Sequence, residues 1–273
     1  MPRVLILSSY VAASRVGGSA QAVALARLGI EPVLIPTVLF GRHPGWGAPG
    51  GAAVAAETMA GMLEGVEGQG FFPQFDALIC GYFADQAQVA LAARTIDTLR
   101  AARAGVRVVV DPIMGDEGVG LYVRAAVAEA IAADLVPRAG LVTPNAWELE
   151  RLTGAKVTNP STAVAAAARL GKPALVSSVR AGAEIGVVYA DAGRGWLAAH
   201  ALETLAPKGT GDLLSAYFTA ALIQRLALHD ALQAAVGAVA ELAGSAGFAD
   251  PEVGRLPIRL GPSARVRLEA VHG

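Results

Sequence analysis

Short runs of apolar and β-branched residues alternate with stretches of helical spacing along most of the chain. This alternation predicts a mostly parallel sheet with helices on both faces, a three-layer α/β/α fold. The expected strands are 4–8, 32–38, 77–80, 106–110, 141–143, 174–177, 185–189 and 196–199. The expected helices are 18–28, 52–66, 85–104, 121–136, 146–153, 161–170, 211–227 and 229–247.

The last two expected strands form a local unit. The runs 185–189 and 196–199 are separated by the turn-forming sequence Asp-Ala-Gly-Arg-Gly, so we expect an antiparallel hairpin at a sheet edge. No Pro/Ser-rich linker or shift in composition divides the chain. We therefore expect one domain that spans residues 1–273.

The composition narrows the classes of protein. Hydrophobic residues make up 54% of the chain. A membrane helix needs an apolar run of about 18 residues without a charge, and no run in this chain is that long. The net charge is −1 and no basic block occurs, so neither nucleic acid nor a membrane is an expected partner. With Cys80 as the only cysteine and a strand pattern at the N-terminus, we expect a cytoplasmic protein.

The most informative stretch is 207–220, where a Gly-Thr-Gly loop leads directly into an apolar helical pattern. Such a junction directs backbone N–H groups and the helix dipole at one point, which suits an anion. Asp212 is placed to accept a proton there, and phosphoryl transfer needs both features. Taken alone, the motif also fits a plain glycine-rich turn in which Asp212 caps the helix.

A pair of acids follows the strand expected at 106–110. Asp111 and Asp116 flank Gly115, and two carboxylates at a strand end can hold Mg²⁺ directly or through water. The alternative for Asp111 is a turn that ends the strand at an Asp-Pro pair. The sequence therefore allows a magnesium site at this strand end.

Further polar residues follow the strand expected at 141–143. Asn145 begins a helix in which Glu148 and Glu150 are two positions apart, so at most one of them faces the strand ends. Glu148 lies three positions after Asn145, and a capping box is its alternative role. Ligands of open α/β sheets bind at such strand ends.

The chain lacks the common nucleotide motifs. It contains no Gly-x-x-x-x-Gly-Lys-Ser/Thr loop, no Gly-x-Gly-x-x-Gly after the first strand, and no His-Arg-Asp or Asp-Phe-Gly element. Its four histidines are scattered, and its serines lack the Gly-x-Ser-x-Gly context of a hydrolase. A kinase built on this chain would have to use the helix start at 209–212.

Taken together, these motifs resemble those of the ribokinase-like superfamily, and within it those of the pyridoxal kinase family. The resemblance rests on 208–213, 111–116 and 143–150, and it extends to 16–19, 36–40, His43, Trp46 and Gly81-Tyr82. It implies transfer of phosphate from ATP to the 5′-hydroxymethyl group of vitamin B6 vitamers. It also implies Mg²⁺ as cofactor and a homodimer, with a monovalent cation as a further candidate.

The resemblance assigns roles to individual residues. Asp212 matches the catalytic base, and the N–H groups of Gly209, Thr210 and Gly211 match the anion hole. The residues implied for ATP and Mg²⁺ are Asp111, Asp116, Tyr122, Thr143, Asn145, Glu148, Ser178 and Lys208, with Asp111, Asp116 and Glu148 on the metal. Those implied for the vitamer are Ser9, Val16, Thr37, Val38, Phe40, His43 and Tyr82, with the Ser9 hydroxyl on the pyridine nitrogen.

Three alternatives stay open at this point. Hydroxymethylpyrimidine (phosphate) kinases resemble this chain but usually have Gly-Thr-Gly-Cys, so Asp212 argues against that acceptor. A ribokinase-type sugar kinase is disfavoured by the apolar segment 38–40 and by Tyr82, and a non-catalytic vitamer-binding protein by the intact set of acids. The departures from the pyridoxal kinase pattern, at Arg15, Gly18 and 41–42, all lie on the acceptor side.

Overall fold

The computed structural model describes residues 1–203, 207–246 and 253–273. Within them one large sheet has the strand order β12-β11-β10-β9-β8-β5-β4-β1-β2-β3. Its strands are β1 (Arg3–Val11), β2 (Glu31–Phe40), β3 (Gly51–Ala53), β4 (Ala77–Cys80), β5 (Arg107–Val110), β8 (Leu141–Val142), β9 (Ala174–Ala181), β10 (Glu184–Asp191), β11 (Arg194–Ala201) and β12 (Arg267–His272). A separate small hairpin pairs β6 (Gly115–Asp116) with β7 (Gly120–Leu121).

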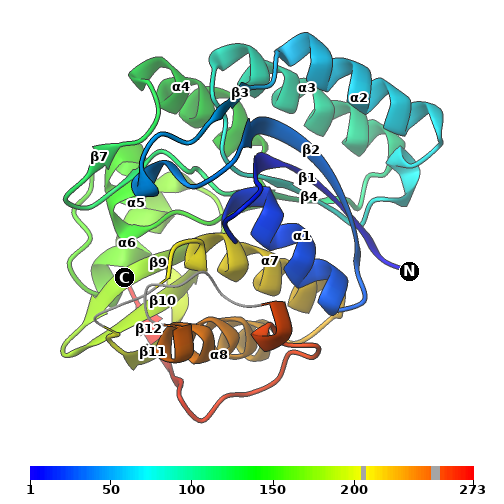
Figure 1. The fold of residues 1–273 in the computed structure, drawn as a ribbon. Helices are drawn as coiled ribbons and strands as arrows, with labels where there is room; N and C mark the ends of the chain where they lie inside the picture. The colour runs from blue at the N-terminus through cyan, green and yellow to red at the C-terminus, as the bar shows by residue number, and fades with distance from the viewer. Residues whose placement is uncertain (204–206, 247–252) are drawn as a thin grey trace.

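Helices cover both faces of the large sheet (Figure 1). They are α1 (Gly17–Arg27), α2 (Ala56–Gly68), α3 (Gln86–Ala102), α4 (Ala125–Ala130), α5 (Ala146–Thr153), α6 (Pro160–Leu170), α7 (Thr210–Ile223) and α8 (Leu228–Ala246). None of the helices in the described part of the chain is long and apolar enough to cross a membrane.

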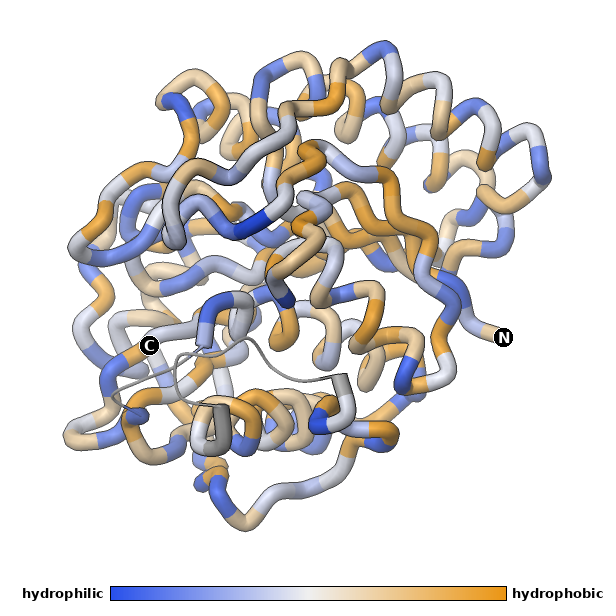
Figure 2. Tube along the Cα trace, in the orientation of Figure 1, coloured by the Kyte–Doolittle hydropathy of each residue, from blue (hydrophilic) through white to orange (hydrophobic). Residues whose placement is uncertain are grey.

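The two faces follow from the alternation of side chains along a strand. In β1, Val4 and Ile6 pack into the core beneath α1, α7 and α8, whereas Leu5 and Leu7 pack into the core beneath α2, α3 and α4. All four side chains are fully buried, and Figure 2 shows the apolar residues gathered along these central strands. The predicted three-layer α/β fold with a mostly parallel sheet is confirmed.

Strand direction changes at both ends of the sheet. The central pairs from β2 to β9 are parallel, while β3 and the group β10 to β12 are antiparallel to their neighbours. The predicted hairpin is β10–β11, with Asp191 opposite Arg194. Its expected position at the sheet edge is wrong, because β12 pairs with β11 and forms the edge instead.

Some expected helix boundaries also change. The helix expected at 52–66 begins only at Ala56, because the preceding residues pair with β2 as β3. The helix expected at 121–136 is shorter: it follows β7 as α4, widens into a π-turn at Ile131–Leu135 and ends in a 3₁₀ turn that contains Pro137. The last residue of the helix expected at 229–247 lies outside the described residues.

Candidate active site

Three of the sequence motifs lie together because each follows the carboxyl end of one of three neighbouring parallel strands. The N–H of Gly81 donates to the carbonyl of Leu7 (2.9 Å), that of Asp111 to Cys80 (2.8 Å) and that of Thr143 to Val110 (2.9 Å). Each bond continues the ladder one residue past a strand end, so Gly81, Asp111 and Thr143 follow adjacent strands. These strand ends are where open α/β sheets bind their ligands.

The Gly-Thr-Gly loop, residues 209–211, forms the start of helix α7. Gly209 is the residue before the helix and has φ 83°, a left-handed conformation that favours glycine. A Cβ atom at Gly209 would collide with the backbone carbonyl of Arg15. Because Thr210, Gly211 and Asp212 form the first turn, helix geometry leaves their N–H groups without an intrahelical acceptor. These donors and the helix dipole can receive an anion.

Asp212 lies in this first turn. Its Oδ1 atom is out of contact with solvent and has no hydrogen-bond partner. Burial raises the pKa of Asp212 to about 6, and a backbone N–H from Gly17 partly opposes that rise. A carboxylate with such a pKa is ionised at neutral pH and still basic enough to accept a proton from an alcohol during its reaction.

Asp111 is buried beside α7, with 7% of its surface exposed. The Ser215 hydroxyl donates to its Oδ2 (2.8 Å) and lies 2.9 Å from the Thr143 hydroxyl. Burial, and then the negative charges of Asp212 and Glu148, hold the pKa of Asp111 well above its usual value. Sequence reasoning missed Ser215; its place three residues after Asp212, one helical turn further on, is the signal that could have found it.

Glu148 is also buried and accepts backbone hydrogen bonds on both oxygens. It forms the capping box of α5 with Asn145, and its Oε1 accepts the N–H of Met114 (2.8 Å). Burial raises the pKa of Glu148 to about 7, although these backbone bonds lower it in part. Glu150 instead pairs with Lys156 at 2.7 Å, so only one of the two glutamates faces the strand ends, as expected.

The β6–β7 hairpin and the residues on either side of it, 114–122, form a flap. Hydrogen bonds attach this flap to the start of α5. Besides the Glu148 contact, the side-chain amide of Asn145 donates to the carbonyl of Gly115 (2.9 Å). Tyr122 ends the flap, and its N–H donates to the carbonyl of Met114 (2.7 Å). The Tyr122 side chain lies beside the Asp116 carboxylate on the flap. Burial, and then this negative charge, raise the pKa of Tyr122.

A magnesium site can be tested against these carboxylates. No group of three His, Cys, Asp or Glu side chains converges as a metal cluster within the described residues. Both oxygens of Glu148 are already bonded to backbone N–H groups, which leaves Asp111 and Asp116 as the freer donors. Burial, and then repulsion from Asp212 and Glu148, raise the pKa of Asp111, and a cation would relieve that repulsion. The residues therefore fit Mg²⁺ that keeps several waters or phosphate oxygens, as this ion prefers.

The residues expected around the acceptor lie on β1, on β2 and the loop after it, at the start of α1 and in the loop after β4. Ser9, Val16, Thr37 and Val38 are buried, while Phe40, His43 and Tyr82 are partly exposed. A Cβ atom at Gly17 would collide with the Ser9 hydroxyl, so Ser9 lies against the same glycine whose N–H lowers the pKa of Asp212. The structure thus brings both Ser9 and Asp212 next to Gly17.

The structure also accounts for Gly18, one of the departures from the family pattern. A Cβ atom at Gly18 would lie 2.5 Å from the Leu34 side chain and 3.0 Å from the carbonyl of Ser9. Gly18 is therefore a close contact between α1 and the strands β1 and β2, rather than a loose turn.

Two expected nucleotide contacts, Ser178 and Lys208, are exposed. Ser178 has φ 61°, which is uncommon for a residue with a side chain. It belongs to a bulge in which Ser177 and Ser178 together oppose Val187, because the β9–β10 register shifts between Gly186 and Val188. Bulges of this kind are common beside binding sites, where they redirect a side chain.

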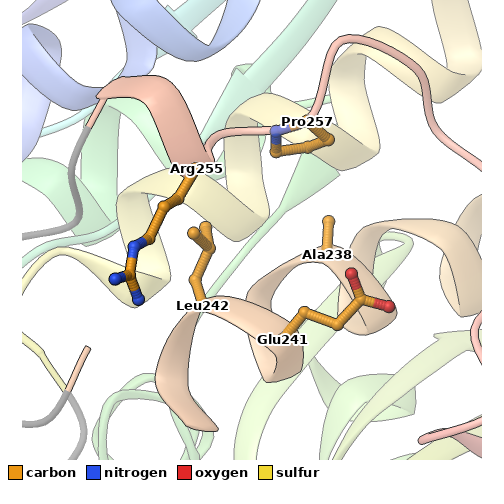
Figure 3. Close-up of a pocket in the computed structure, with 5 residues that line it drawn as sticks. All are labelled: Ala238, Glu241, Leu242, Arg255 and Pro257. Atoms are coloured by element: carbon orange, nitrogen blue, oxygen red, sulfur yellow. The ribbon is translucent and has the colours of Figure 1, made fainter. Parts of the chain in front are cut away.

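A cavity of about 370 Å³ lies between α8 and the segment after residue 253 (Figure 3). Leu242 and Ala238 contribute an apolar wall, while the charged groups of Glu241 and Arg255 lie at its sides. None of its lining residues was expected in the site from the sequence.

Comparison with known proteins gives a consistent result. The family model described as phosphomethylpyrimidine kinase matches residues 74–250, more than half of the chain. Pyridoxal kinase PdxY of Deinococcus radiodurans is 35% identical over 254 residues, which cover 88% of this chain and 85% of that protein. Pyridoxine/pyridoxal/pyridoxamine kinase of Bordetella avium is 35% identical over 239 residues, covering 85% and 81%.

Solved structures agree on the fold. Pyridoxal kinase from Entamoeba histolytica superposes with a TM-score of 0.91 at 23% identity and 99% coverage of both chains. Pyridoxal kinase from Leishmania donovani in complex with ADP and pyridoxine superposes with a TM-score of 0.87 at 23% identity, covering 98% of both chains. The α/β fold with a mostly parallel central sheet is therefore that of the solved pyridoxal kinases. The chain belongs to the pyridoxal kinase family.

Proposed function

We propose that this protein transfers the γ-phosphoryl group of ATP to the 5′-hydroxymethyl group of vitamin B6 vitamers. The observation that carries the proposal is Asp212, a carboxylate of raised pKa in the first turn of α7, beside unpaired N–H groups. The names of the curated relatives support this reaction, as do the neighbouring structures with ADP and a vitamer.

In this proposal Asp212 accepts the proton of the substrate hydroxyl as its oxygen attacks the γ-phosphorus. The new oxygen–phosphorus bond forms while the bond to the β-phosphate oxygen breaks, and ADP leaves with that electron pair. The N–H groups of Gly209, Thr210 and Gly211 would donate to the oxygens of the moving phosphoryl group. Mg²⁺, when bound near Asp111, Asp116 and Glu148, would neutralise charge on the phosphates.

The remaining expected contacts divide between the two substrates. Toward the nucleotide we assign the flap with Asp116 and Tyr122, together with Thr143, Asn145, Ser178 and Lys208. Ser178 and Lys208 are exposed, Asn145 is half-buried and Thr143 is buried. Asn145 uses its side chain to cap α5 and to hold the flap, so its effect on ATP would be indirect.

For the vitamer, we propose that the Ser9 hydroxyl bonds the pyridine nitrogen. The ring would lie between apolar and aromatic walls from Val38 and Tyr82, which suit a flat heteroaromatic ring. Val16, Thr37, Phe40 and His43 complete the assigned lining. A carbonyl oxygen of the Tyr82 loop already accepts the Thr37 hydroxyl at 2.7 Å, so the role of Thr37 would be to hold that wall.

The second candidate is phosphorylation of a hydroxymethylpyrimidine. The name of the matching family model favours it, and its aromatic acceptor would fit similar walls. The acid at position 212 and the names of the curated relatives favour the vitamer instead.

We also propose a homodimer in the cytoplasm, as the family resemblance implies. Tyr10 and Leu39 are opposite each other on β1 and β2 and are 43% and 50% exposed, close to the edge strand β3. Exposed apolar pairs beside a sheet edge are candidate contacts for a second copy of the chain.

The test is ATP consumption by the purified protein with pyridoxal, pyridoxine, pyridoxamine and hydroxymethylpyrimidine, each with and without Mg²⁺. Turnover with at least one vitamer, at a kcat/KM above that for the pyrimidine, is the expected result. A preference for the pyrimidine would replace the first candidate with the second. Binding of a vitamer without any turnover would instead indicate a non-catalytic binding protein.

A further inference from the structure

Gln88 is a fully buried polar residue in the first turn of α3 that none of the sequence motifs includes. Its amide is saturated with hydrogen bonds. Oε1 accepts the N–H of Ala84 (2.8 Å), and Nε2 donates to the carbonyls of Thr37 (2.8 Å) and Val54 (2.7 Å). A buried side-chain amide with this number of bonds fixes the relative positions of its partners.

Two of the three partners of Gln88 belong to walls of the proposed acceptor site, and the third, Val54, directly follows β3. Thr37 and Val38 lie near the carboxyl end of β2, and Ala84 belongs to the loop that carries Tyr82. Two further bonds fix the backbone of Tyr82. Its carbonyl accepts the Thr37 hydroxyl at 2.7 Å, and its N–H donates to the hydroxyl of Ser8 at 3.3 Å.

Packing alone does not explain an amide at this position. The residues around it on α3, among them Val89 and Leu91, belong to an apolar core, and an apolar side chain would fill the same space. Without the amide, the N–H of Ala84 and the carbonyl of Val54 would lose this partner, and the carbonyl of Thr37 would keep only the N–H of Val54 (2.9 Å). The loop that carries Tyr82 and the end of β2 would then no longer be held at a fixed distance from each other by this amide.

We infer that Gln88 is a positioning residue for the acceptor substrate. It sets the separation between the wall at Thr37–Val38 and the wall that carries Tyr82, and it touches neither the vitamer nor ATP. The inference rests on the proposed function, because it concerns the shape of the site to which the vitamer is assigned.

The first experiment compares Gln88→Met with Thr95→Val in the full-length protein. Thr95 is a matched control on the same helix: it is buried, and its hydroxyl bonds only the carbonyl of Leu91 within α3 (2.9 Å). We expect Gln88→Met to raise the KM for pyridoxal about tenfold, with kcat and the KM for ATP changed less than about twofold. Thr95→Val should leave all three constants unchanged.

A double-mutant cycle with Tyr82→Ala then separates positioning from general destabilisation. If Gln88 acts through Tyr82, its effect on the pyridoxal KM should shrink to less than about twofold once the Tyr82 ring is removed. Equal effects in both backgrounds, or an equal rise in the KM for ATP, would overturn the inference.

Gln88→Glu provides a second variant if Gln88→Met does not fold. A protonated carboxyl can keep the bond from Ala84 and donate to one of the two carbonyls, so its pyridoxal KM should exceed that of the wild type by less than the about tenfold expected for complete loss of the amide. An unchanged KM would contradict the inference. A wild-type protein with no turnover on any vitamer would remove the proposed function itself, which is a different outcome from an active enzyme indifferent to Gln88.

Discussion

At the scale of single residues, the site is a concentration of buried negative charge. Asp111, Glu148 and Asp212 all have a raised pKa, and burial is the largest cause for each. Groups of this kind cluster where a protein binds a cation or moves a proton. Their charges nevertheless act against folding, so the function of each can be separated from its contribution to stability.

Asp212→Asn should lower kcat by about 10²–10⁴-fold, the usual contribution of a general base, with vitamer binding nearly unchanged. In the wild type, kcat/KM should fall as the pH drops below about 6, because protonation of Asp212 removes the base. Steady-state kinetics between pH 5 and pH 8 and calorimetric titration of the vitamer measure the two effects. Equal losses of binding and turnover would assign Asp212 a structural role instead.

Asp111→Asn should stabilise the free protein and reduce its activity. The amide oxygen can still accept the Ser215 hydroxyl, whereas the cost of burying a charge and the repulsion from Asp212 and Glu148 are lost. We expect a gain of about 1–2 kcal/mol in the free energy of unfolding and a loss of at least about tenfold in kcat/KM. Urea denaturation measures the first quantity.

Asp97→Asn is the control for that substitution. Asp97 is 55% exposed and pairs with Arg138 at the surface, so its loss should change the free energy of unfolding by less than about 1 kcal/mol. A destabilised Asp111→Asn would mean that the carboxylate's hydrogen bonds with Ser215 and Thr143 are stronger than those of an amide by more than the repulsion costs.

At the scale of elements, the decisive feature is the start of α7. Its loop was the strongest signal in the sequence because glycine spacing and an acid at a helix start are local properties. The contacts that complete it join residues far apart in the sequence, so local patterns do not show which groups pair. Ser215 bonds Asp111 over a separation of 104 residues, and the carbonyl of Arg15 lies where a Cβ atom of Gly209 would be.

Gly209→Ala should destabilise the protein and impair phosphate transfer. It combines a left-handed φ with a collision against the Arg15 carbonyl, which should cost about 1–3 kcal/mol of unfolding free energy. Gly211→Ala is the matched control, because no atom lies within 4 Å of its Cβ position. Thermal and urea unfolding of both variants measure the difference, and equal stabilities would contradict the assignment of the loop geometry.

The order of strands and helices was predictable, since apolar periodicity is read locally. The short strands β3 and β12 were not. Gly51–Ala53 is a fully exposed sequence, and Arg267–His272 alternates polar and apolar residues weakly, so each is a strand mainly because a neighbour pairs with it. The roles assigned to individual side chains around the substrates stay predictions.

At the scale of the whole molecule, the raised pKa values connect pH to folding. For Asp212 and Glu148 the folded-state pKa, about 6 and about 7, lies above the ordinary value. Their stabilising contribution is therefore fully present at low pH, below the unfolded pKa, and is lost as the pH rises through the folded pKa. The free protein should lose this contribution between about pH 4 and pH 7.

The Tm of the free protein should accordingly fall between pH 5 and pH 8, and it should fall less in Asp111→Asn. Mg²⁺ with ATP should raise the Tm more at pH 8 than at pH 6, because a cation stabilises the ionised carboxylates. Differential scanning fluorimetry measures the Tm at each of these pH values, with and without Mg²⁺ and ATP. A ligand effect independent of pH would indicate that the cation binds away from these acids.

The proposed homodimer gives a second test at this scale. Light scattering on the wild type should report about twice the chain mass of 27.7 kDa. Leu39→Lys should shift the protein toward the monomer, because a charge would be buried at the contact. Ile258→Lys is the control, since Ile258 is 66% exposed elsewhere on the surface. A dimer that survives Leu39→Lys would place the contact on another face.

The position of Gly17 has a practical consequence for anyone who wishes to redesign this protein. Ser9 and Asp212 both lie next to this glycine, and Gly209 packs against the adjoining residues Arg15 and Val16. Libraries that randomise 15–18 to accept a new alcohol would therefore disturb reactivity and recognition together. Diversity introduced at Tyr82 and Phe40 would leave that junction intact, so new specificities should be recovered there at a higher rate.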